Sequence, residues 1–186
     1  MSVHPRLLDH PFYQAWNRGE ISAETLSAYH QSYGEFVKRF PSFWQRVVDA
    51  FQQDIARGAS IVDEESEHVP LWEQWGKNLN PPHSSPGLKD LVDAFDHMTP
   101  SRLLGAIQAF ETQQPEVART KKDGLRGFYG FREEDLAYFD EHLDEMNHIA
   151  YGSWLGENFA DRNEFNEGFA QGAELIYKSL DRFTTA

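Results

Sequence analysis

The sequence contains no cysteine, so disulfides, thiolate metal ligands and cysteine nucleophiles are excluded. It has no apolar run of about 18 residues and no basic start followed by an apolar core, so neither a membrane span nor a secretory signal is expected. Lys and Arg number 17 against 30 Asp and Glu, which gives a net charge of −13. Because nucleic acids and anionic membranes are bound by clustered cations, we expect neither as a partner. Without a membrane span or a secretory signal, we expect a cytoplasmic location.

Strand-like alternation is also missing, whereas apolar residues recur at helical spacing along most of the chain. A length of 186 residues suits one domain with a substantial core. We therefore predict a single all-α domain over residues 1–186, a bundle of about seven helices. Pro41 is expected to end a helix that starts at Ser22, and Gly58 to close a helix over 42–57. An acidic helix start is the plain interpretation of 63–67, and 78–87 is expected to be a surface loop.

Two stretches carry chemistry-bearing side chains at suggestive spacing. Glu111 lies four residues before Pro115, which we expect to bend the helix beside this carboxylate. Glu64 and His68 lie four residues apart and so share a helix face, although Glu65, three residues from His68, is a competitor. Solvated acids are the plain alternative at both places.

Several collinear segments carry a resemblance to a known family. They are HPFYQAWNRGE at 10–20, YHQSYGEFVKRFP at 29–41, DEESEH and LW within 63–72, FETQQPEVARTKKDGLRGFYGF at 110–131 and YFDEH at 138–142. Together they make the chain resemble the heme-oxygenase-like diiron oxidases of the TenA, PqqC and CADD group, in particular the CADD-like branch. This resemblance implies a heme-oxygenase-like helical bundle. TenA thiaminases use a cysteine nucleophile, which this chain lacks.

The resemblance also implies a set of site residues. The implied metal ligands are Glu64, His68, Glu111, His142, Glu145 and His148, and the implied catalytic side chains are Tyr13, Tyr29, Lys121 and Tyr138. Such a mixed carboxylate and imidazole shell suits iron or manganese. An aromatic pair such as Tyr29 and Tyr33 is otherwise common as core packing, and a Lys121–Lys122 pair at a helix end is otherwise common as a solvated cation pair.

The helix expected over 132–151 departs from the family pattern. The family has a histidine, a carboxylate four residues later and a second histidine three residues after that. From His142, the next groups come at Glu145 and His148, which spreads the three side chains over about 120° of a regular helix. Glu141, Glu145 and His148 do keep the family spacing. A local irregularity that restores His142, a ligand role for Glu141, and a weakened metal position all remain open.

The function implied by the resemblance is that of a dioxygen-consuming oxidase with two metal ions, Fe/Fe or Fe/Mn, and an external electron donor. CADD-like proteins are linked to forming p-aminobenzoate for folate from a tyrosine ring and a lysine amine of their own chain. The alternatives are a related oxidase that acts on a free amino acid or a fatty acid, and a metal-free binding protein. PqqC-like cofactorless oxidation fits less well, because its polyanionic substrate needs cations that are few here. The oligomeric state is left open, with a homodimer as one option.

Overall fold

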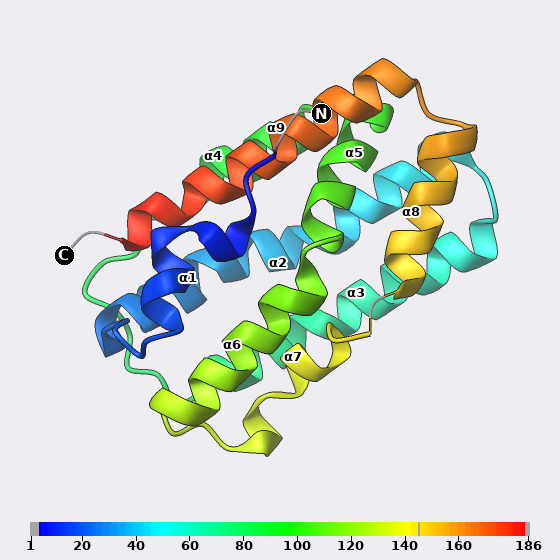
Figure 1. The fold of residues 1–186 in the computed structure, drawn as a ribbon. Coiled ribbons are helices and arrows are strands. Elements are labelled where there is room, and N and C mark those ends of the chain that lie inside the picture. The colour runs from blue at the N-terminus through cyan, green and yellow to red at the C-terminus, as the bar shows by residue number, and fades with distance from the viewer. Residues whose placement is uncertain (1–3, 145, 185–186) are drawn as a thin grey trace.

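The computed structural model describes residues 4–144 and 146–184, and the regular elements in these ranges are all helical (Figure 1). The all-α prediction is therefore confirmed. The α-helices are α1 Pro11–Trp16, α2 Ala23–Phe51, α3 Ile55–Gly76, α4 Lys89–Asp96, α5 Pro100–Glu111, α6 Gln114–Phe128, α7 Ala137–Glu141, α8 Met146–Asn158 and α9 Arg162–Ser179. Short 3-10 helices cover Leu7–Asp9, Glu133–Asp135 and Leu180–Phe183. None of the described helices is both long enough and apolar enough to cross a membrane.

Helix α2 starts as expected and then continues much further than expected. The Ser22 side chain caps it by accepting a hydrogen bond from the backbone N–H of Thr25. The prediction that Pro41 ends this helix is wrong, because α2 runs through the proline to Phe51. A proline inside a helix costs about 3 kcal/mol. Phe36, Phe40, Phe43 and Trp44 are all buried on either side of it, and burying each contributes about 2 kcal/mol, so packing outweighs the local penalty.

Helix α3 corrects two further expectations. It begins at Ile55, after Asp54 adopts a left-handed conformation and caps the backbone N–H of Arg57. Gly58 therefore lies in its first turn and does not close a helix. The acids at 63–67 lie in the middle of α3, so the plain interpretation of an acidic helix start is wrong.

Pro115 lies in the first turn of α6, where its missing N–H costs no hydrogen bond. The expected bend inside one long helix is thus a break between two helices. Glu111 is the last residue of α5, and its side chain is almost completely buried. The carboxylate therefore projects from a helix end into the interior of the bundle.

Glycines allow α5 and α9 to pack backbone against backbone (Figure 1). A Cβ added at Gly168 would overlap the carbonyl oxygen of Arg102, and one added at Gly105 would overlap the carbonyl oxygen of Phe165. Close packing of this kind tolerates little displacement. Because Glu111 ends α5, the contact with α9 helps to fix the position of that carboxylate.

Candidate metal centre

Helices α3, α5 and α8 bring Glu65, Glu111 and His148 together in the interior. One ligand atom from each side chain lies within 4.8 Å of the others, and all three residues are buried. His148 Nδ1 is 3.2 Å from an oxygen of Glu65 and 3.6 Å from an oxygen of Glu111. Two carboxylates and one imidazole in this arrangement could hold a first-row metal ion.

The pKa values in this group show how a proton takes the place of a cation. Burial disfavours charge on His148, but hydrogen bonds with Glu111 and Glu65 outweigh burial and raise its pKa to about 12. Burial likewise opposes the charge of Glu65, yet hydrogen bonds with His148 and His68 lower its pKa to about 2. Burial raises the pKa of Glu111. An imidazolium between carboxylates is therefore the favoured state without metal, and a metal ion would displace its proton.

A pair of imidazoles, those of His68 and His142, adjoins this group through Glu65. One Glu65 oxygen faces His148, and the other is 3.4 Å from His68 Nδ1. The centroids of the His68 and His142 rings lie 4.4 Å apart, and the Nδ1–H of His142 donates to the backbone carbonyl of Tyr138 at 2.6 Å. Burial, followed by repulsion from His68, lowers the pKa of His142 to about 3, so its neutral, ligand-competent form is favoured.

An interruption between two helices places His142 in this group. The expected helix over 132–151 is divided into α7, which ends at Glu141, and α8, which begins at Met146. In one regular helix, His142 and His148 would lie about 120° apart around the axis, so both could not point inward equally. The break allows both histidines to be buried, whereas Glu141 is exposed. Glu145 lies outside the described residues.

The carboxylate of α3 that enters the interior is Glu65, although the sequence pattern favoured Glu64. The buried face of α3 includes Ile61, Glu65, His68 and Trp72, which follow helical spacing, and Glu64 lies about 100° away from Glu65 around the helix. The Glu64 side chain is 44% exposed and accepts a hydrogen bond from His148 Nε2 at 3.0 Å. This contact orients the imidazole so that its Nδ1 faces the buried carboxylates.

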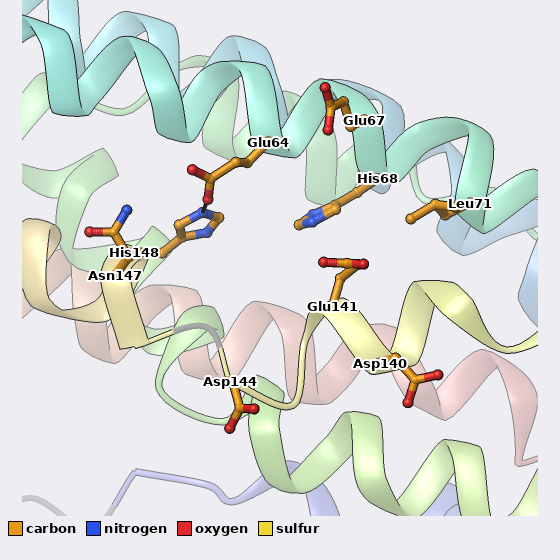
Figure 2. A pocket seen from close by; sticks show the side chains of 9 residues that line it. All are labelled: Glu64, Glu67, His68, Leu71, Asp140, Glu141, Asp144, Asn147 and His148. Carbon is orange, nitrogen blue, oxygen red and sulfur yellow. Dashed lines mark hydrogen bonds and ion pairs between the residues drawn. The ribbon is translucent and has the colours of Figure 1, made fainter.

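A cavity of about 450 Å³ leads from the surface to His68 and His148 (Figure 2). Figure 2 shows Glu64 and Glu141 on opposite sides of it, with the imidazoles of His68 and His148 directed into the space between them. Acidic side chains also contribute much of the remaining lining: Glu67, Asp140 and Asp144. The opening therefore favours cations over anions.

Lys121 lies in an aromatic cage in the interior. Its side chain faces inward with Val117, Ala118 and Leu125 of α6, and the residue is 3% exposed. The ammonium nitrogen is 5.3 Å from the ring centroids of Tyr29 and Tyr33, and 5.9 Å from those of Tyr13 and Trp72. Burial lowers the pKa of Lys121 to about 7. The alternative of a solvated lysine pair is thus wrong for Lys121, whereas Lys122 forms ion pairs with Asp140 and Glu133.

Tyr138 lies between the cage and the histidines. Its ring centroid is 4.9 Å from that of Trp72, 4.2 Å from that of His142 and 6.2 Å from that of His68. Tyr13 and Tyr29 are buried within the cage itself, and burial raises the pKa of both phenols. The structure therefore gathers Tyr13, Tyr29, Lys121 and Tyr138 in one region beside the carboxylate and imidazole group.

Sequence reasoning missed several members of this region. Tyr33 and Trp72 complete the cage, and Trp44 donates its indole N–H to Glu111 at 3.0 Å. A signal existed for Trp72, which lies one helical turn beyond His68 and therefore on the same face. No local pattern distinguishes Trp44 from an ordinary core residue, because its partner is 67 positions away.

Comparison with known proteins finds relatives that the chain covers over most of their length. No family model matches it. It is 29% identical to a 4-aminobenzoate synthase of Chlamydia muridarum over 198 residues, covering 95% of this chain and 84% of that protein. It is also 29% identical to a 4-aminobenzoate synthase of Nitrosomonas europaea over 209 residues, covering 94% of this chain and 84% of that one.

The fold has a solved counterpart. A TenA homolog from Pseudomonas syringae superposes with a TM-score of 0.77 at 14% identity, covering 96% of this chain and 86% of that one. At this identity the likeness shows the fold alone. Together with the sequence relatives, it confirms the resemblance to the TenA, PqqC and CADD group and to its CADD-like branch.

Proposed function

We propose that this chain is a metal-dependent oxidase that forms p-aminobenzoate from side chains of its own, as the names of its relatives suggest. The observation that carries the proposal is the position of Lys121: a buried amine within 6 Å of three tyrosine rings, joined through Tyr138 to a buried carboxylate and imidazole group. Among the residues that the structure describes, no acidic side chain pairs with Lys121. A buried amine of this kind is unfavourable to the fold, so a functional role is the better explanation of it.

The buried carboxylate and imidazole residues could form two metal sites. Glu111 and His148 would hold one ion, His68 and His142 would hold the other, and Glu65 would lie between them with one oxygen toward each. These ions with dioxygen supply the oxidising power. The acidic cavity beside Glu64 and Glu141 offers cations a path inward.

The cage residues supply the atoms of the product. A buried tyrosine, Tyr13 or Tyr29, provides the ring, and Lys121 provides the nitrogen. With a pKa of about 7, a large share of Lys121 is unprotonated near neutral pH, so its lone pair is available. Burial keeps the phenols protonated, which makes loss of a hydrogen atom the accessible reaction, and it keeps water away from reactive species.

The cavity argues against a free fatty acid or amino acid as the substrate. A fatty acid needs a long apolar tunnel, whereas five carboxylates line this opening, which would also repel the carboxylate of an amino acid: Glu64, Glu67, Asp140, Glu141 and Asp144. A substrate that is already inside the protein avoids both difficulties.

Expression in a bacterium that requires p-aminobenzoate tests the proposal. We expect the chain to relieve the requirement, and Lys121→Arg to abolish this, because arginine remains charged and cannot give up its nitrogen as an amine. Arg119→Lys, on the same helix, is the matched control and should have no effect. Failure of the unaltered, soluble chain to relieve the requirement would refute the proposal.

A purified protein experiment then tests whether the substrate is the chain itself. Protein grown on ring-labelled tyrosine and reconstituted with Fe²⁺, Mn²⁺, dioxygen and a reductant should release labelled p-aminobenzoate, and at most one molecule per chain. Tyr13→Phe and Tyr29→Phe identify the ring donor. Repeated turnover of an added free substrate, with unlabelled product, would contradict a self-derived ring.

A further inference from the structure

The indole of Trp44 contacts the proposed metal centre through Glu111, and Trp44 does not line the acidic cavity. Its side chain is fully buried, and Nε1 donates to an oxygen of Glu111 at 3.0 Å. The ring also lies 6.2 Å from that of His148. An oxidisable ring is therefore in direct contact with one carboxylate of the centre and close to its histidine.

Two further aromatic rings continue from Trp44 toward solvent. The centroid of Tyr151 is 6.1 Å from that of Trp44, and the centroid of Trp154 is 6.0 Å from that of Tyr151. Trp44 and Tyr151 are completely buried, whereas Trp154 is partly exposed on α8. Every ring in the series is an indole or a phenol, the side chains that lose an electron most readily, and only the outermost ring, that of Trp154, reaches solvent.

Contacts hold the middle ring in place. Tyr151 donates its hydroxyl to the carbonyl of Gln53 at 2.6 Å, and the guanidinium of Arg57 lies 5.4 Å above the ring. A cation over the ring opposes removal of an electron from it. Tyr151 is thus suited to carry an electron between the indoles of Trp44 and Trp154, and not to persist as a radical itself.

We infer that Trp44, Tyr151 and Trp154 form a route for single electrons between the surface and the carboxylate and imidazole group. The inference rests on the proposed function, since reduction of dioxygen requires electrons from outside. A one-electron donor, such as a reduced flavin or iron–sulfur protein, loses one electron at Trp154, and the oxidised centre beside Glu111 gains it. No bond in the route forms or breaks, and the indole N–H of Trp44 and the hydroxyl of Tyr151 keep their protons.

A second aromatic series provides an internal control. Tyr29, Trp16 and Tyr129 are spaced at 5.9 Å, and Tyr129 is only partly buried. This series reaches the surface from the Lys121 cage and makes no contact with Glu111 among those described. Changing Tyr129 therefore alters a surface aromatic ring without touching the proposed route.

The absence of cysteine allows a photo-oxidant to be attached at one chosen place. Glu157→Cys introduces a unique thiol at an exposed position one helical turn beyond Trp154. A ruthenium polypyridyl label on it, oxidised by flash and quench, takes one electron from the protein. Transient absorption then measures the yield and lifetime of the tryptophan radical in the full-length, metal-free protein.

We expect a long-lived radical, because Trp44 is shielded from solvent and quenchers. Trp154→Phe should decrease its yield about tenfold or more, which corresponds to a barrier raised by about 1.4 kcal/mol. Trp44→Phe should leave only a short-lived surface radical, and Tyr129→Phe should change nothing. Trp154 is partly exposed, so its replacement by Phe preserves the fold and decides the test even if Trp44→Phe does not fold.

An unchanged yield of long-lived radical in Trp154→Phe would overturn the inference, as would an equal loss in Tyr129→Phe. Because the measurement uses neither metal nor p-aminobenzoate, a failure here is distinct from a failure of the proposed function, which growth without p-aminobenzoate tests separately.

Discussion

Replacing Lys121 by methionine should stabilise the protein, and by an amount that depends on pH. Burial lowers the pKa of this lysine from 10.5 to about 7. One pKa unit corresponds to about 1.4 kcal/mol, so the charged form is disfavoured by about 5 kcal/mol in the folded state. Methionine has a similar length and carries no proton, so Lys121→Met removes this cost. Lost contacts between the ammonium and the four rings reduce the gain somewhat.

The direction of the pH dependence follows from proton binding. Between pH 7 and 10.5 the unfolded chain holds a proton on Lys121 that the folded chain has released, so the free energy of unfolding of the unaltered protein rises with pH by up to about 1.4 kcal/mol per pH unit. The advantage of Lys121→Met should therefore be largest below pH 7, at most about 5 kcal/mol, and should have nearly vanished at pH 10.5.

Urea denaturation followed by far-UV circular dichroism, at several values between about pH 6 and 9.5, measures the difference between variant and unaltered protein. Taking the difference cancels the titration of every other group. Lys122→Met is the matched control, because hydrogen bonds with Asp140 and Glu133 raise the pKa of Lys122, so its effect should be flat over this range. A flat difference for Lys121→Met as well would refute the argument that this amine is buried.

Three further predictions concern the metal centre and the helix packing. Glu64 only orients His148, so Glu64→Gln should lower the affinity for iron and manganese about tenfold. Glu65 is a proposed ligand, so Glu65→Gln should lower the affinity much more; metal titration followed by elemental analysis measures both losses. Because Glu111 and Glu65 raise the pKa of His148 to about 12, His148 carries a proton near neutral pH, and metal binding should release it. Metal affinity should therefore increase with pH, and a pH-indicator dye in weakly buffered solution would detect the released proton; no release would mean that His148 is not a ligand. Gly168→Ala should cost about 3 kcal/mol of stability by overlap with the α5 backbone. Gly127→Ala, with open space around it, should instead stabilise by up to about 1 kcal/mol; equal thermal shifts in the two variants would contradict the described packing.

Helical periodicity in the sequence was sufficient to predict an all-α fold and the start of α2 at Ser22. The predictions at Pro41 and Gly58 were wrong because they considered only the local helix preference of these residues, which amounts to a few kcal/mol. At Pro41, the burial of aromatic residues on both sides of the proline outweighs that preference. Local signals thus predicted that helices exist better than they predicted where each one ends.

The site shows the same limit at the scale of single residues. Spacing identified the right turn of α3, but adjacent carboxylates differ by about 100° around a helix, and only the packing of Ile61 and Trp72 determines that Glu65 faces inward. The position of His142 depends on a break between α7 and α8 that its spacing raised as one alternative among three. The burial of Lys121 depends on tyrosines from two other helices and has no local signature.

The glycine contacts of α9 give the C-terminal helix an influence that its own side chains do not suggest. None of its residues belongs to the metal centre or to the lysine cage, yet its backbone is the surface against which α5, and with it the Glu111 carboxylate, is seated. A proteolytic clip or frameshift that removed this last helix would spare every side chain with a proposed chemical role. We nonetheless expect the shortened polypeptide to be inactive, because α5 would lose the surface that fixes the Glu111 carboxylate relative to the histidines.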